Sequence, residues 1–216
     1  MNTADLISNL SSKATPVKTL KKPSYLVLQF MLFSVAYYTA IQTSLGVRGD
    51  IIERFSQPFF TIEIGLILLL LFSCLVTAVL TIYPDNYQKS FLLKSPYMVL
   101  LALFCFFIGE FFLLNQTDLT ASSGHNFECT LCIAGFAIIP SLYFFYILRK
   151  GVNMNPHKAG AFTIIAATAI SAIALRVSEH SDGISHMLIW HYFPILVFSL
   201  IGAFIAPYVV GNPRGN

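Results

Sequence analysis

Charged residues are scarce in this sequence. Asp, Glu, Lys and Arg make up 11% of its 216 residues, whereas a soluble domain usually carries about 25%. Hydrophobic residues reach 56%, and the mean hydropathy is +0.72. A soluble fold of this length has too little interior to hide so much apolar surface, and a lipid environment removes that constraint. The scarcity of charge therefore argues against a soluble protein and predicts one that lies in a membrane.

Several enzyme motifs are missing as well. The sequence has no Gly-rich phosphate loop, no His-Glu-x-x-His metal motif and no nucleophile elbow. No proton relay crosses the middle of the predicted spans, and no pair of broken spans indicates a transport site. Glu63 and Glu110 lie near the outer interface, where we expect contact with water or an ion pair with Arg176. We predict a protein that is not an enzyme and makes no direct contact with nucleic acid.

Six apolar runs follow one another along the chain. They cover residues 24–46, 60–83, 95–114, 127–148, 159–176 and 187–208. Each is about 18–24 residues long, and a helix of about 20 residues crosses the bilayer core. The connectors hold helix breakers such as Pro58, Pro96 and Pro156. The predicted fold is all-α, a polytopic membrane bundle of six transmembrane helices with a short N-terminal cytoplasmic helix.

Lysine and arginine indicate the orientation of the spans, because they concentrate on the cytoplasmic side. With the N-terminus inside, the inner segments hold ten of the 13 basic residues, and the outer loops hold only Arg48, Arg54 and Arg176. We therefore expect a bacterial inner-membrane protein with both termini in the cytoplasm. Its predicted parts are a cytoplasmic tail at 1–23, a transmembrane domain at 24–208 and a second cytoplasmic tail at 209–216.

The N-terminal tail carries an apolar stripe. Leu6, Ile7 and Leu10 share one face of a short predicted helix, with Asp5 in its first turn. Pro16 ends the pattern. Such a stripe docks into a groove of a partner protein or lies on the lipid surface beside the lysines, and a disordered tail is the third possibility.

Thiols and imidazoles gather in the outer segments. Cys129 and Cys132 are three residues apart near the start of the fourth run, and the last outer loop carries His180, Asp182 and His186. These groups favour soft or borderline metals, and two thiols in an oxidising compartment also form disulfides. The candidate metal ligands are Cys129, Cys132, His125, His180 and His186.

Simpler roles for the same residues stay open. Cysteine packs as a small hydrophobe in membrane helices, which is what we expect of Cys74 and Cys105 in mid-span. His186 and His191, beside Trp190, fit an interfacial anchor. We predict no resident cofactor, only transient binding of a heavy metal.

Taken in order along the chain, a set of short segments resembles the NrsF-type anti-sigma factors. These are six-span bacterial membrane proteins that act as negative regulators of extracytoplasmic-function sigma factors. The segments are Asp5-Leu6-Ile7 with Leu10 and Pro16-Val17, then Glu128-Cys129, Pro140 and Leu148-Arg149-Lys150-Gly151, then Ala174-Leu175-Arg176, His180 and Asp182, and finally Trp190-His191, Pro194 and Gly202-Ala203.

The resemblance implies that the tail holds a sigma factor through Asp5, Leu6, Ile7 and Leu10. It also implies that a heavy metal or oxidant acting on the outer face weakens this hold, with Cys129, Cys132, His180 and Asp182 as sensing residues. Members of the family are expected to pair the cysteine at Cys129 with one in the last outer loop. This sequence has Ser178 and His180 there instead.

The predicted function is thus a membrane-bound anti-sigma factor whose partners are a sigma factor and the lipid bilayer. Two other functions remain in view. A thiol oxidoreductase would use Cys129 and Cys132 and would need a relaying thiol pair or a quinone. A small transporter would need polar residues near the middle of the spans, where this sequence has few.

Overall fold

A computed structural model describes residues 2–12, 20–84, 86–113, 126–151, 153–180 and 183–210. Helices dominate these residues, and no strand occurs among them, which confirms the predicted all-α class. Six of the helices are long and apolar enough to cross a membrane. The six predicted runs correspond to these six helices in the same order.

The first helix, α1 (Thr3–Ser12), precedes the bundle. The spans are α2 (Pro23–Leu45), α4 (Pro58–Leu80), α5 (Ser90–Leu113), α6 (Asn126–Leu148), α7 (Pro156–Ser178) and a last span. The last span consists of α8 (Ile184–His186), the π-helix η2 (Met187–Tyr192) and α9 (Phe193–Val209). Two short helices, α3 (Ile51–Phe55) and the 3-10 helix η1 (Asn86–Lys89), lie between spans.

Three prolines that were expected in connectors lie within helices. Pro58 and Pro156 do not lie in connectors, because each begins a helix. A proline suits the first helical position, where its missing N–H would have no partner in the helix. The expectation that Pro96 lies in a connector is also wrong, since α5 begins at Ser90 and contains it.

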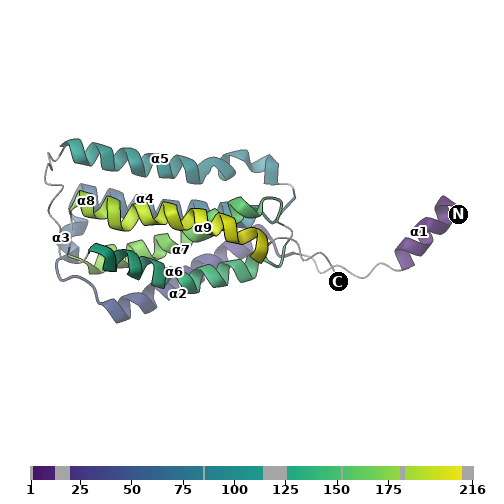
Figure 1. Ribbon diagram of the computed structural model, residues 1–216, viewed down its shortest axis with the longest axis horizontal. Helices are drawn as coiled ribbons and strands as arrows, with labels where there is room; N and C mark the ends of the chain where they lie inside the picture. The colour runs from purple at the N-terminus through teal and green to yellow at the C-terminus, as the bar shows by residue number, and fades with distance from the viewer. Residues whose placement is uncertain are drawn as a thin grey trace.

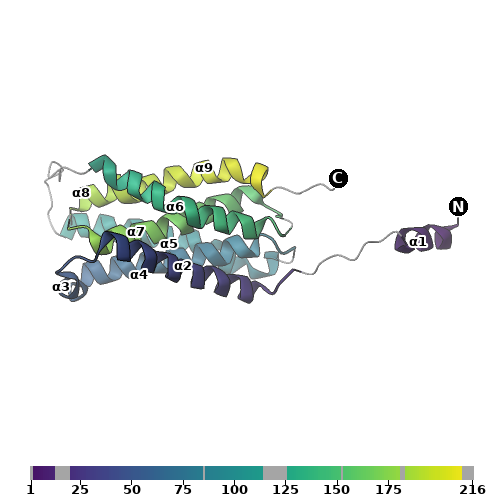
Figure 2. The same ribbon diagram turned by 90° about the horizontal axis from the view of Figure 1, so that it is seen from below.

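The spans alternate in direction and run side by side, as Figures 1 and 2 show. We call the end of the bundle where α2 begins and α9 ends the tail end. The opposite end, where α2 ends and α6 begins, is the cluster end. In both views α1 lies apart from the bundle, beyond the tail end.

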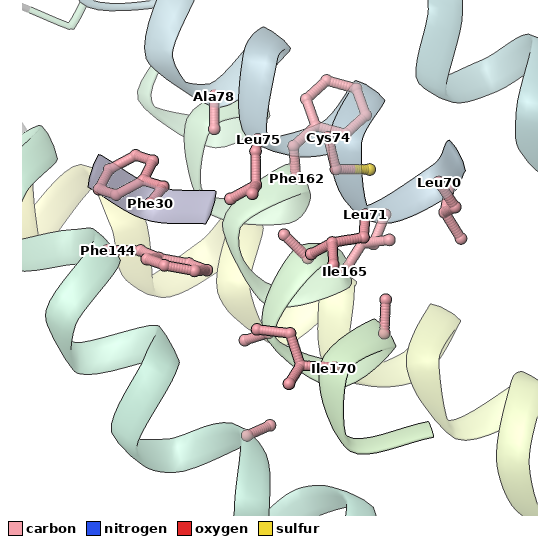
Figure 3. Packing of buried hydrophobic residues seen from close by; sticks show 14 of the residues in the cluster. Phe30, Leu70, Leu71, Cys74, Leu75, Ala78, Phe144, Phe162, Ile165 and Ile170 are labelled. Atoms are coloured by element: carbon pink, nitrogen blue, oxygen red, sulfur yellow. The ribbon is translucent and has the colours of Figure 1, made fainter. Parts of the chain in front are cut away.

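Helix α7 forms the centre of the bundle. From Ala159 to Val177, every residue except Ala161 and Ile164 is buried. Most of these side chains are small, which lets α4, α6 and α9 approach α7 closely. Figure 3 shows the apolar core that results, in which Phe162, Ile165 and Ile170 of α7 face side chains of the neighbouring helices.

Helices α7 and α9 approach each other closely at two glycines. A Cβ added to Gly160 would lie 2.2 Å from the carbonyl oxygen of Gly202, and one added to Gly202 would lie 2.3 Å from Ile164 Cγ1. Neither position has room for a side chain. Close contact of this kind supplies the van der Waals attraction that holds membrane helices together.

Four prolines in the spans share a further feature. A proline inside a helix has no N–H to give to the carbonyl four residues earlier. In each of the four cases a side chain from another span donates to that carbonyl, which keeps a polar group satisfied in an apolar setting.

Two of these contacts join the middle spans. Pro96 in α5 has no N–H to donate to the Leu92 carbonyl. That carbonyl accepts instead from the Thr77 hydroxyl of α4 at 2.9 Å. Pro140 in α6 likewise has no N–H to donate to the Phe136 carbonyl. That carbonyl accepts from the Tyr37 hydroxyl of α2 at 2.8 Å.

The other two contacts hold the last span. The Trp190 carbonyl, four residues before Pro194, accepts from the Thr130 hydroxyl of α6 at 2.8 Å. The Ala203 carbonyl, four residues before Pro207, lies 3.0 Å from Nδ1 of His157 in α7. The last span is therefore tied to α6 at the cluster end and to α7 near the tail end.

Candidate functional site

The last turn of α7 joins α2 at the cluster end. The Ser178 hydroxyl lies 2.7 Å from the Gly46 carbonyl and 2.9 Å from Oε1 of Gln42. The amide of Gln42 in turn donates to the Ala174 carbonyl at 2.9 Å. Because Gln42 and Ala174 are buried, the bond between them is protected from water, and together with the Ser178 contacts it fixes the end of α2 against α7.

Arg48 extends this connection to the residue after α7. Its side chain is buried, and its guanidinium donates to the Glu179 carbonyl at 2.8 Å. Asp50 holds the guanidinium from the other side at 2.7 and 2.9 Å. These bonds from Arg48, with a further one from Arg54, hold the pKa of the Asp50 carboxyl well below its usual range. The segment that follows α2 is therefore bonded directly to Glu179.

The Glu179 side chain meets three potential ligands of a metal ion. Its Oε1 lies 3.2 Å from Nε2 of His186, and its Oε2 lies 3.1 Å from Nε2 of His191. The Cys129 thiol lies 3.5 Å from both oxygens. We call these four residues the outer cluster. Cys129, His186 and His191 are buried and Glu179 is half-buried.

The π-helix η2 explains how two histidines five residues apart reach the same carboxylate. In an α-helix, side chains at this spacing diverge by about 140°, whereas the i→i+5 turn of a π-helix brings them to one face. The His186 and His191 ring centroids are 5.3 Å apart. The ring of Pro194 would clash with the Trp190 carbonyl in a regular α-helix, and the widened turn lies directly before it.

The environment of Glu179 favours its charged form. Burial disfavours ionisation, but the contact with His191 and the neighbouring His186 and Cys129 outweigh it, so the pKa of the Glu179 carboxyl is lowered. A carboxylate, a thiol and two imidazoles therefore converge on one small volume. This set of groups suits metal binding or a change of protonation, and it lies where α2, α6, α7 and the last span meet.

A second polar contact lies deeper in the bundle. Arg176 Nε and Glu63 Oε2 are 2.9 Å apart, and both side chains are buried. The Tyr192 hydroxyl donates to Glu63 Oε1 at 2.5 Å. The Arg176 guanidinium also lies over the ring of Phe60, 4.9 Å from its centroid. The expected pairing of Glu63 with Arg176 is thus confirmed, and it ties α7 to α4 and to the last span.

The family model for negative regulators of sigma F matches residues 10–210. The chain belongs to this family. No curated protein and no solved structure matches it. The family confirms the resemblance found from the sequence and names a regulator of a sigma factor, not a class of enzyme.

Two of the predicted sensing residues of this sigma-factor regulator lie outside the outer cluster. Cys132 is half-buried one turn beyond Cys129, and His180 is exposed. The predicted residues His125 and Asp182 lie outside the described residues. Cys129 and His186 are the two candidates that the structure brings together.

Glu179 and His191 are cluster members that were not among the predicted ligands. Glu179 follows the last turn of α7, so its direction depends on the residue at which that helix ends. His191 reaches the cluster only through the π turn. Pro194, three residues later in the sequence, is the one signal that points to a widened turn at this position.

No disulfide joins the four cysteines, all of which the structure describes as free thiols. Cys74 is buried in α4, and Cys105 is exposed on α5. At the place where the family pattern expects a second outer cysteine, this regulator presents Glu179 and the two histidines to Cys129.

The predicted sigma-binding residues lie on α1. Leu6 and Ile7 are 42% and 62% exposed, so the apolar stripe is available to a partner. Asp5 is in the first turn of the helix, and Leu10 is one of its residues, although the Leu10 side chain lies outside the described part. The family match begins at Leu10 and does not include the first residues of α1.

Proposed function

We propose that this chain is a membrane-bound anti-sigma factor. In this proposal, α1 holds an extracytoplasmic-function sigma factor at the cytoplasmic side, and a signal at the outer cluster releases it. The observation that carries the proposal is the exposed apolar stripe of α1, on a helix that lies apart from the bundle. Exposed leucine and isoleucine on one helical face fit a helix-in-groove contact with a protein partner.

The distribution of charge supports this orientation. Lys21, Lys22, Lys94, Lys150 and Lys158 lie in or beside the spans at the tail end. Basic residues next to spans favour the cytoplasmic side. The tail end is therefore the cytoplasmic end in our proposal, and the outer cluster faces the periplasm.

The path from the outer cluster to the tail runs through α2. At the cluster end, Arg48 and Gln42 bond α2 and its following segment to the end of α7. At the tail end, the Tyr83 hydroxyl donates to the Lys21 carbonyl, just before α2 begins. A signal that favours another arrangement of Glu179 would shift α2 and the tail, provided that it binds the two arrangements with different affinity.

The test uses the full-length protein, co-expressed with an extracytoplasmic-function sigma factor from the same organism. Replacing the stripe in a Leu6→Ser, Ile7→Ser double variant removes two side chains worth about 1.5–3 kcal/mol each when buried. We expect at least a tenfold loss of sigma factor that co-purifies with the membrane protein, and a matching rise of a sigma-dependent reporter.

The matched control is a Ser8→Ala, Ser12→Ala double variant, which alters the opposite face of the same exposed helix. It should retain the sigma factor at the wild-type level. If the stripe variant also retains it, α1 is not the binding element. If the stripe variant retains the sigma factor and only a variant lacking residues 2–12 loses it, then α1 binds the sigma factor through polar contacts and not through the apolar stripe.

A further inference from the structure

We infer that the outer cluster is a four-ligand site for a divalent metal ion of the zinc class. Its ligands are the Cys129 thiolate, one oxygen of Glu179, and the imidazoles of His186 and His191. The site itself stands on the geometry of these four residues. Its role as the input of the sensor rests on the function proposed above.

The positions of the ligand atoms carry the inference. One sulfur, one oxygen and two nitrogens lie within 4.8 Å of one another. In a tetrahedral zinc site, with bonds of about 2.0–2.3 Å, ligand atoms are about 3.5 Å apart. A contraction of about 1 Å converts the present arrangement into a coordination sphere.

His191 adds a second, independent observation. Its side chain is 1% exposed, and Nε2 points to Glu179 from 3.1 Å. Yet the orientation of this nitrogen gives it no hydrogen bond within the described part of the chain. A buried imidazole usually has a well-aligned hydrogen bond or a metal. An ion between His191 and the carboxylate would satisfy both groups.

The donor set selects the metal. A thiolate and two imidazoles favour zinc and its close analogues over magnesium or calcium, which prefer oxygen ligands. Four protein ligands leave no open position for a substrate, as in structural zinc sites. The site therefore fits binding and not hydrolytic catalysis.

Binding changes the protonation of the cluster in a defined way. The Cys129 thiol loses its proton when the Zn–S bond forms, whereas the carboxylate oxygen and the imidazole nitrogens coordinate through lone pairs. One proton is released for each ion bound. In the same step, the carboxylate gives up one of its contacts with His186 or His191 to coordinate the ion.

The contraction has a consequence for the sensor. Glu179 also accepts the hydrogen bond from Arg48 through its backbone, so a shift of Glu179 toward the ion acts on the segment that follows α2. In the proposed sensor, the ion would then favour the arrangement that releases the sigma factor.

Cobalt(II) is the probe, because its spectrum reports tetrahedral geometry and a thiolate ligand directly. Titration of the purified full-length protein in detergent should give one bound ion per chain, with a thiolate charge-transfer band that excess zinc removes. Cys129→Ser should lose this band. His191→Gln and Glu179→Gln should weaken binding by at least about tenfold.

Two neighbouring substitutions serve as controls. Cys132→Ser alters a thiol on the same helix, and His180→Gln alters an imidazole in the same loop, both outside the outer cluster. Both should bind cobalt as the wild type does. The site is wrong if no one-to-one complex forms, or if these controls lose binding as the cluster variants do.

A reporter assay separates the site from its role. Zinc added to cells should raise sigma-dependent expression in the wild type and in Cys132→Ser, and not in His191→Gln. If the purified protein binds the ion but the reporter does not respond, the metal site stands and its role as the input is wrong.

Discussion

At the scale of single residues, Glu63 and Arg176 are charged groups in an apolar interior. Their contact at 2.9 Å, completed by the Tyr192 hydroxyl and the ring of Phe60, satisfies both charges. Such a pair adds little compared with an apolar core of the same shape, but loss of one partner leaves the other charge buried alone. The pair therefore fixes how α4, α7 and the last span meet.

Glu63→Gln should destabilise the protein by about 3–5 kcal/mol, because it leaves the Arg176 charge without its partner. The measurement is the unfolding of the detergent-solubilised protein in a denaturing detergent. Glu53→Gln, at an exposed position of α3, should change stability by less than about 0.5 kcal/mol. A Glu63→Gln, Arg176→Met double variant should regain part of the loss. If Glu63→Gln unfolds as the wild type does, the pair of Glu63 and Arg176 makes no strong contribution to stability.

Single residues also mark the limit of prediction from the sequence. The Glu63–Arg176 contact was one of the expected alternatives, because lone charges in apolar spans need a partner. The Glu179 contacts were not expected. They depend on the residue at which α7 ends and on the π turn before Pro194. A pattern of residue types does not predict the position of either feature to within one residue.

At the scale of elements, the prolines link pairs of helices. The Tyr37 hydroxyl of α2 and the Phe136 carbonyl of α6 meet because Pro140 leaves that carbonyl without an N–H from its own helix. Hydropathy predicted the spans that these residues belong to. It did not predict this pairing, since the donor and the acceptor are 99 residues apart in the sequence.

Tyr37→Phe removes the donor and little else, so we expect a loss of about 0.5–2 kcal/mol of stability. In a Pro140→Ala background, the helix supplies its own N–H to Phe136, and the same substitution should cost almost nothing. The coupling between the two changes is measured in a double-mutant cycle, with the exposed Tyr208→Phe as the control. Equal losses in both backgrounds would mean that the proline is not what makes Tyr37 necessary.

At the scale of the whole molecule, the bundle separates two ends with different chemistry. The outer cluster and its bonds to α2 lie at one end, and the lysines of the described residues and α1 lie at the other. The sequence predicted this division from hydropathy and the positions of lysine and arginine. The central place of α7 was not predicted, because hydropathy finds a span without showing which spans surround it; the many alanines of α7 are the feature of the sequence that fits its burial.

The proposed orientation has a direct test by reporter fusions. A fluorescent protein that folds only in the cytoplasm should fluoresce at either terminus. Alkaline phosphatase, which is active only in the periplasm, should be active when inserted at Gly49, in the loop after α2 at the cluster end. The reverse pattern would place α1 on the wrong side for a sigma factor.

The four proline contacts also bear on how the chain is assembled during synthesis. In every case the donor precedes the proline in the chain: Thr77 before Pro96, Tyr37 before Pro140, Thr130 before Pro194 and His157 before Pro207. If these helices enter a bilayer in chain order, each one with an unsatisfied carbonyl meets a helix that already carries its donor. The helices that contain these prolines are therefore synthesised after the helices that supply their missing hydrogen bonds.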